Sequence, residues 1–218
     1  MELQQLINAA PLLLRALEQT LLIAAASIVI SVALGLALAE IGLLGGRAAT
    51  FVTRCLIEAV RGVPLLVFVF LTYYLLPKAG LNVDTIYSGS IALSLFFAVY
   101  AAEIFRGAFR TIPKVQAEAG LALGMRTWQI QFIVLLPQAV RVALPSLMNL
   151  SAIMIKATSV VSIIGVWELT LATQEIVMRT LSPFTFFTAA LVMYFVLCYG
   201  TVTTGALLAK RLNKAQRA

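Results

Sequence analysis

Histidine is absent from this sequence of 218 residues, and charged residues of either sign are scarce. Without histidine the chain lacks the commonest metal ligand and the usual proton-transfer group at neutral pH. Only nine residues are acidic, and the sequence contains no visible nucleophile-and-base pair or metal-ligand cluster. Cys55 and Cys198 both fall in apolar runs, where a lone cysteine behaves as a small hydrophobic residue. We therefore expect no disulfide, no bound metal and no catalysis of covalent chemistry.

Apolar residues fill the space that charge leaves: 61% of the chain is hydrophobic and 11% is charged. A soluble domain carries about 25% charged residues. So much apolar surface does not fit inside one water-soluble core, which predicts an integral membrane protein. The net charge is +7, but no basic run is interleaved with aromatics on a soluble segment, so nucleic acid is not expected as a partner.

Five stretches are long and apolar enough to cross a membrane as helices, which takes about 20 residues each. They cover approximately residues 12–39, 55–76, 88–110, 138–164 and 183–209. No long linker or soluble segment separates them. The sequence therefore predicts a single all-α transmembrane domain over residues 1–218.

Lysine and arginine are distributed unevenly between the predicted loops. One side of the membrane receives Arg47, Arg54, Arg61, Arg106, Arg110, Lys114, Arg126, Lys210, Arg211, Lys214 and Arg217, whereas the other receives only Arg15, Lys78 and Arg179. Basic residues favour the cytoplasmic side. This bias predicts an N-terminus outside the cell, a cytoplasmic C-terminus and a cytoplasmic loop at about residues 111–137.

The loop at residues 111–137 contains a candidate docking helix. Gln116 to Leu123 is a good helix-forming stretch, Pro113 suits a first helical turn, and Gly124 is placed to end the helix. We expect the chain to turn into the next span at Pro137. The residues alone leave two interpretations open: a helix that fits a groove in a cytoplasmic partner, or a helix that only lies on the lipid headgroups.

Glu118-Ala119-Gly120, three residues, Gly124, nine residues, Val134 and then Leu136-Pro137 resembles the EAA loop of ABC-importer permeases. Gly120 replaces the second alanine of that pattern, and Val134 replaces an isoleucine. Flanking motifs resemble the polar amino-acid subfamily of these permeases, namely Arg61–Leu66, Ala102–Ala108, Leu136–Asn149, Lys156–Ser159 and Glu168-Leu169. Together they cover approximately residues 61–169.

This resemblance implies the five-helix fold of type I ABC importers, in the inner membrane of a bacterium. It implies that ATPase subunits dock on the loop through Glu118, Ala119, Gly120, Leu121, Gly124 and Met125. A second permease, which we expect to be a different chain rather than another copy, and an extracytoplasmic amino-acid-binding protein complete the expected assembly. The chain itself has no phosphate-binding Gly-x-x-x-x-Gly-Lys loop, so ATP and Mg²⁺ are expected to act in the separate ATPase subunit.

Polar residues within the predicted spans are candidates for the substrate path, because ionisable groups in a membrane are costly. The candidates are Tyr100, Glu103, Lys156, Thr158, Ser159 and Glu168. Each has an alternative structural interpretation. In that interpretation Lys156 pairs with Glu103 or Glu168, and Glu103 pairs with Arg106. The two hydroxyls bond their own helix, Tyr100 is a tyrosine of the membrane interface, and Glu168 is solvated. The expected substrate is a polar amino acid, with an opine-like derivative as an alternative; a channel or carrier that works alone is the rival interpretation.

Overall fold

The computed structural model describes residues 2–214, and it describes the side chains of residues 4–210. Within that part every regular element is helical. In chain order they are α1 (Glu2–Leu44), α2 (Gly46–Arg61), α3 (Leu65–Lys78), α4 (Thr85–Thr111), α5 (Val115–Ala122), α6 (Thr127–Gln129), the π-helical η1 (Ile130–Leu135), α7 (Leu136–Val161), the 3-10 helix η2 (Ser162–Ile164), α8 (Leu169–Thr180) and α9 (Pro183–Lys214). The predicted all-α architecture is confirmed.

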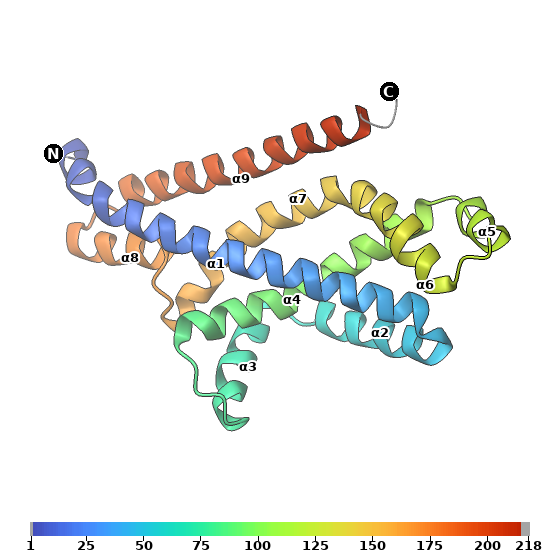
Figure 1. Cartoon of the computed structure of the whole chain (residues 1–218). Helices are drawn as coiled ribbons and strands as arrows, with labels where there is room; N and C mark the ends of the chain where they lie inside the picture. The colour runs from blue at the N-terminus through green and yellow to red at the C-terminus, as the bar shows by residue number, and fades with distance from the viewer. Residues whose placement is uncertain (1, 215–218) are drawn as a thin grey trace.

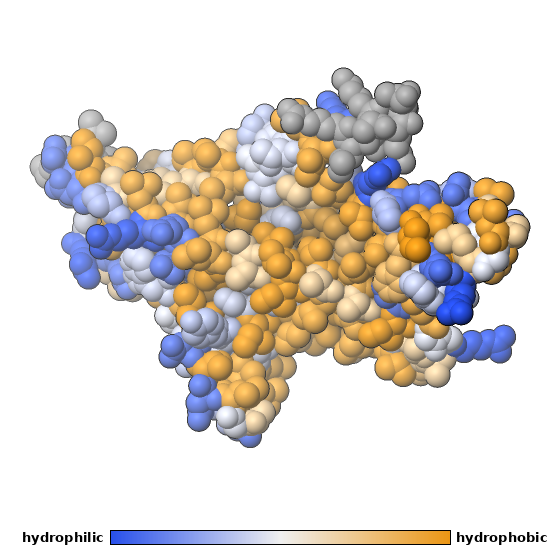
Figure 2. Space-filling view, in the orientation of Figure 1, coloured by the Kyte–Doolittle hydropathy of each residue, from blue (hydrophilic) through white to orange (hydrophobic). Residues whose placement is uncertain are grey.

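The spans form one bundle with an apolar middle (Figure 2). Within the described residues four helices are long and apolar enough to cross a membrane: Gln4–Leu44, Thr85–Thr111, Thr127–Ile164 and Pro183–Lys210. Helices α2 and α3 pass the same test only as a pair, and they bend by 105° at their junction. Figure 2 shows the apolar surface between hydrophilic groups at the two ends of the bundle, as expected for an integral membrane protein.

The predicted span over residues 55–76 is not one continuous helix. The chain breaks between Arg61, where α2 ends, and Leu65, where α3 begins. Pro64 lies at the break in an extended conformation, and it also disfavours the helical conformation for Val63 before it. In Figure 1, α2 lies beside α1, whereas α3 projects from the body of the bundle.

The expected turn at Pro137 is also wrong, because one helical segment continues from Thr127 to Ile164. Pro137 is the second residue of α7, and η1 ends at Leu135, directly before α7 begins. The chain turns earlier, at Gly124, whose φ of 75° is a left-handed conformation that glycine adopts readily.

The two ends of the bundle differ in what they carry (Figure 1). Helix α1 runs from the N-terminal end to the end where α5 and α6 lie, and α9 runs from the α8 end back toward α5. This arrangement agrees with the predicted topology, although the choice of the cytoplasmic side stays a prediction. Of the predicted basic tail, the side chains of Arg211 and Lys214 and all of Arg217 lie outside the described residues.

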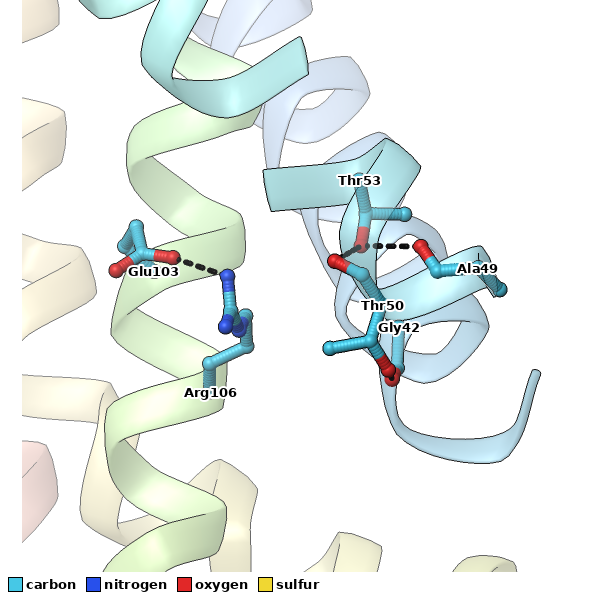
Figure 3. A network of polar contacts seen from close by, with 6 residues as sticks. All are labelled: Gly42, Ala49, Thr50, Thr53, Glu103 and Arg106. Atoms are coloured by element: carbon cyan, nitrogen blue, oxygen red, sulfur yellow. Dashed lines mark hydrogen bonds and ion pairs between the residues drawn. The ribbon is translucent and has the colours of Figure 1, made fainter. Parts of the chain in front are cut away.

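A close approach of α1 to α4 holds the centre of the bundle. A Cβ atom on Gly35 would lie 2.5 Å from the Cβ of Ala101 and 2.7 Å from the carbonyl oxygen of Ala98. The small residue at position 35 therefore sets the spacing of α1 and α4. At the end of α1, the Thr50 hydroxyl donates to the carbonyl oxygen of Gly42 at 2.7 Å and ties α2 against α1 (Figure 3).

Replacement of Gly35 by alanine is expected to destabilise the protein by about 1–3 kcal/mol, because the new methyl group overlaps backbone that has no room to move. Gly200→Ala in α9 is the matched control, since a Cβ there meets no atom within 4 Å. Thermal unfolding in detergent measures both variants. Equal unfolding temperatures would contradict the close approach of α1 and α4.

Candidate functional site

Helix α5 is the predicted docking helix, and the structure places it at Val115–Ala122, outside the bundle of long helices (Figure 1). Its C-terminus closes as expected from Gly124. The Gly124 amide donates to the carbonyl oxygen of Leu121 at 2.9 Å, and the Met125 amide donates to that of Gly120 at 3.0 Å. Such contacts satisfy carbonyl groups that a helix end leaves without partners. The predicted helix is confirmed, with its bounds shifted by one residue.

The surface of α5 divides into an exposed face and one buried position. Glu118, Ala119 and Leu121 are exposed, and the side chain of Leu123 just beyond the helix is 80% exposed. Gly120 is buried: a Cβ there would lie 2.8 Å from the Cγ1 atom of Ile130 in η1. Thus α5 offers an acidic and apolar surface outward and leans on η1 through Gly120.

A cavity of about 620 Å³ lies between α2, α4 and α7. We call it the α2–α4–α7 cavity; its lining residues are Arg61, Tyr100, Glu103, Ile104, Pro145, Ser146, Asn149, Leu150 and Ile153. The Arg61 guanidinium carbon lies 5.7 Å from the centre of the Tyr100 ring, within the range of a cation–π contact. Its lining includes one cationic and one anionic side chain together with neutral hydrogen-bonding groups.

The acidic side of the cavity is held by an ion pair within α4. Arg106 Nη1 donates to Glu103 Oε1 at 2.7 Å, and Figure 3 shows the two side chains turned toward each other. The Arg106 side chain is 10% exposed, whereas that of Glu103 is 40% exposed. The predicted pairing of Glu103 with Arg106 is confirmed. Glu103 also lines the cavity, so its ion pair with Arg106 is compatible with its prediction as a substrate-path residue.

Four of the predicted substrate-path residues do not line this cavity, namely Lys156, Thr158, Ser159 and Glu168. Lys156 is exposed and lies toward the α8 end of its helix rather than midway along it. The Thr158 hydroxyl donates to the carbonyl oxygen of Ile155 at 2.8 Å, and the Ser159 hydroxyl donates to that of Lys156 at 2.7 Å, as their structural interpretation requires. Within the described residues Lys156 makes no ion pair, so the suggested pairing with Glu103 or Glu168 is wrong.

Glu168 is fully buried, so its interpretation as a solvated residue is wrong. Its Oε1 accepts from the backbone amides of Thr170 at 2.7 Å and Leu171 at 3.0 Å, which caps the N-terminus of α8. Its Oε2 accepts from the Tyr194 hydroxyl of α9 at 2.7 Å. Glu168 thereby joins α8 to α9 at the end of the bundle opposite α5.

Sequence reasoning found Tyr100 and Glu103 but missed three of their neighbours in the cavity, Arg61, Ser146 and Asn149. Arg61 carried a signal, since it is a charge beside an apolar run and begins one of the flanking motifs. The break before Pro64 ends α2 at Arg61 and places its side chain at the cavity. No group of three or more metal-ligating side chains occurs in the part of the chain that the structure covers.

A bundle of membrane helices that presents a short exposed helix at one end agrees with the permease expected from the sequence resemblance. The family described as "Binding-protein-dependent transport system inner membrane component" matches residues 16–214. The chain belongs to this family, and it is a permease subunit of an ABC importer with ATPase and binding-protein partners.

Several relatives are similar over most of the chain. The probable amino-acid ABC transporter permease protein PatM of Vibrio harveyi is 41% identical over 83% of this chain and 81% of its own length. The glutamine transport system permease protein GlnP of Escherichia coli K12 is 36% identical over 87% of each chain. The crystal structure of an amino acid ABC transporter with histidines superposes with a TM-score of 0.86 at 30% identity, covering 94% of this chain and 96% of that one.

The MetNI methionine ABC transporter in its inward-facing conformation shares the fold, with a TM-score of 0.79 at 18% identity over 94% of this chain and 97% of that one. That likeness extends the fold to more distant importers. The type I permease fold predicted from the resemblance is therefore confirmed.

Proposed function

We propose that this permease subunit takes up a polar amino acid that an extracytoplasmic binding protein delivers. The relatives named above support an amino acid, since their names include glutamine and amino-acid transport systems. The observation that carries the proposal is the α2–α4–α7 cavity, whose lining includes the opposite charges Arg61 and Glu103. A zwitterion is the substrate that such a pair of charges fits.

Recognition by the cavity would proceed through charge and hydrogen bonding. The Arg61 guanidinium offers a planar fork of donors that matches a substrate carboxylate. Glu103, which Arg106 holds in place, offers a carboxylate to the substrate ammonium group. Asn149 and Ser146 supply neutral donors and acceptors, and the Tyr100 ring supplies an apolar wall. Lys156 lies farther along α7 than Asn149, between the cavity and α8, where it would draw the substrate carboxylate toward the cavity.

Energy would enter at the opposite end of the molecule from the binding protein. Two ATPase subunits, which use ATP and Mg²⁺, would dock on α5 of this chain and on the equivalent helix of a second permease that is a different chain. Closure of the ATPase pair on ATP would move the two α5 helices and switch the cavity between its outward and inward openings. In this proposal the N-terminus lies outside and the C-terminus lies in the cytoplasm, with the protein in a bacterial inner membrane.

Uptake by the whole assembly tests the proposal. The permease, co-purified with its partner permease and ATPase, is placed in liposomes with the binding protein, and uptake of labelled glutamine, arginine, histidine, glutamate and cystine is measured with and without ATP. We expect ATP-dependent uptake of one polar amino acid. Uptake by this chain alone would support a stand-alone carrier, and uptake of octopine but of none of these amino acids would support an opine permease.

Removal of the Arg61 charge is expected to raise the KM for uptake by about 10–100-fold, because a hydrogen bond to a charged group is worth about 1.5–3 kcal/mol. Arg61→Ala tests recognition of the substrate carboxylate, and Glu103→Gln tests recognition of the substrate ammonium group. Arg54→Ala is the matched control, since Arg54 is exposed on the same helix and does not line the cavity. Equal effects of Arg61→Ala and Arg54→Ala would contradict recognition in the cavity.

A further inference from the structure

The start of the long helical segment Thr127–Ile164 has an unusual form, because η1 winds as a π-helix from Ile130 to Leu135 between α6 and α7. π-Helical turns are rare, they distort the backbone ladder, and they often mark functional positions. Two consecutive side chains at the beginning of η1, Ile130 and Gln131, are both buried and reach different helices. This pair makes η1 a structural link between α5 and α1.

The first half of the link is the contact of Ile130 with α5. Ile130 is 5% exposed, and it occupies the space that a side chain at position 120 would need. A glycine at position 120 thus lets η1 approach the α5 backbone closely. Apolar contact of this kind transmits a push, because tightly packed atoms have no free volume between them.

The second half of the link is a buried hydrogen bond to α1. Gln131 Nε2 donates to Glu40 Oε2 at 2.9 Å, and the residues are 6% and 8% exposed. The other carboxylate oxygen, Oε1, is buried and accepts no hydrogen bond from any described residue. A half-satisfied buried carboxylate lowers stability, so stability alone does not account for a glutamate at this position.

We propose that Glu40 and Gln131 are positioning residues that carry the movement of α5 to α1. A hydrogen bond to a carboxylate is directional and strong where water is excluded, so it transmits a pull and a rotation that sliding apolar surfaces do not. The two carboxylate oxygens give Gln131 two alternative acceptors. When α5 moves, the amide switches from Oε2 to Oε1, and α1 follows without losing its connection. This inference rests on the proposed docking of the ATPase at α5.

The reconstituted importer tests the link through the number of substrate molecules taken up per ATP hydrolysed. In Glu40→Ala we expect this ratio to fall about tenfold, while co-purification with the ATPase and basal hydrolysis remain. Glu40→Gln keeps one acceptor for Gln131 but loses the second, so it should restore only part of the ratio. Glu18→Ala is the matched control, because Glu18 is an exposed glutamate on the same helix.

The exchanged pair, Glu40→Gln with Gln131→Glu, restores a donor and an acceptor across the same gap and should recover coupling where Gln131→Leu alone does not. An unchanged ratio in Glu40→Ala would overturn the inference, and so would a parallel loss of uptake and hydrolysis in every variant. If the wild-type assembly showed no ATP-driven uptake, the proposed function would fail and this inference with it. A normal wild-type importer with an insensitive Glu40 would overturn the inference alone.

Discussion

Glu118→Lys is expected to abolish ATP-driven uptake while the permease remains folded and inserted. Glu118 is exposed in the first turn of α5, the outward surface that we assign to the ATPase. Reversal of its charge replaces an attraction with a repulsion across the docked surface, and a like-charge contact there costs several kcal/mol. Because α5 is the site at which energy enters, the loss extends to transport as a whole. Uptake in liposomes and co-purification of the ATPase measure the effect.

Gln116→Lys provides the matched control for Glu118→Lys. It adds the same side chain to the same helix at an exposed position, but two residues away, which is about 200° around an α-helix. A general effect of positive charge near the membrane would act on both variants equally. Glu118→Gln separates the lost attraction from the added repulsion and should show a smaller defect. Normal uptake by Glu118→Lys would count against a docking role for α5 and favour a helix that only lies on the headgroups.

Glu168→Ala is expected to destabilise the permease by about 3 kcal/mol. The variant loses the cap of α8, worth about 0.5–2 kcal/mol, and the hydrogen bond from Tyr194 to a charged group, worth about 1.5–3 kcal/mol, while the Thr170 hydroxyl 3.1 Å away remains a partner of Tyr194. The unfolding temperature in detergent should fall by about 10 °C for a protein of this size. Tyr194→Phe removes only the contact to α9 and should account for part of the loss.

Glu18→Ala controls for the removal of a glutamate from the same end of the bundle. Glu18 is exposed, so its replacement should leave the unfolding temperature unchanged within about 0.5 kcal/mol. If Glu168→Ala unfolded at the wild-type temperature and lost substrate uptake, Glu168 would act in transport rather than in holding α8. That outcome would restore the interpretation of Glu168 as a substrate-path residue.

The predicted positions of α5 and of the long helices were close to those observed, for a local reason. Gly124 needs only its own left-handed backbone conformation to end α5, and a run of apolar residues needs only lipid to become a spanning helix. The break of the second predicted span was also signalled locally by Pro64. Hydropathy favoured a continuous span there, because it takes no account of backbone restriction.

The candidate site was harder to predict, because its residues come from three helices far apart in the chain. Tyr100 and Glu103 were recognised as polar residues in a span, but nothing in their spacing brought Arg61 or Asn149 beside them. Lys156 appeared central in the sequence because it is the charge nearest the middle of the predicted span. In the structure the helical segment begins earlier, at Thr127, so Lys156 lies nearer its C-terminal end at Ile164.

The sequence by itself determined the membrane class, the approximate positions of the long helices and the helix at Glu118, because hydropathy, helix signals and motif spacing are properties of neighbouring residues. Only the tertiary structure decided that Arg61 and Glu103 share a cavity, that Glu168 holds α8 to α9, and that Gln131 reaches Glu40. Those pairings depend on which faces of distant helices meet. The packing of small residues such as Gly35 and Gly120 sets that geometry. Their contacts join residues that are far enough apart in the chain that no local sequence pattern predicts them.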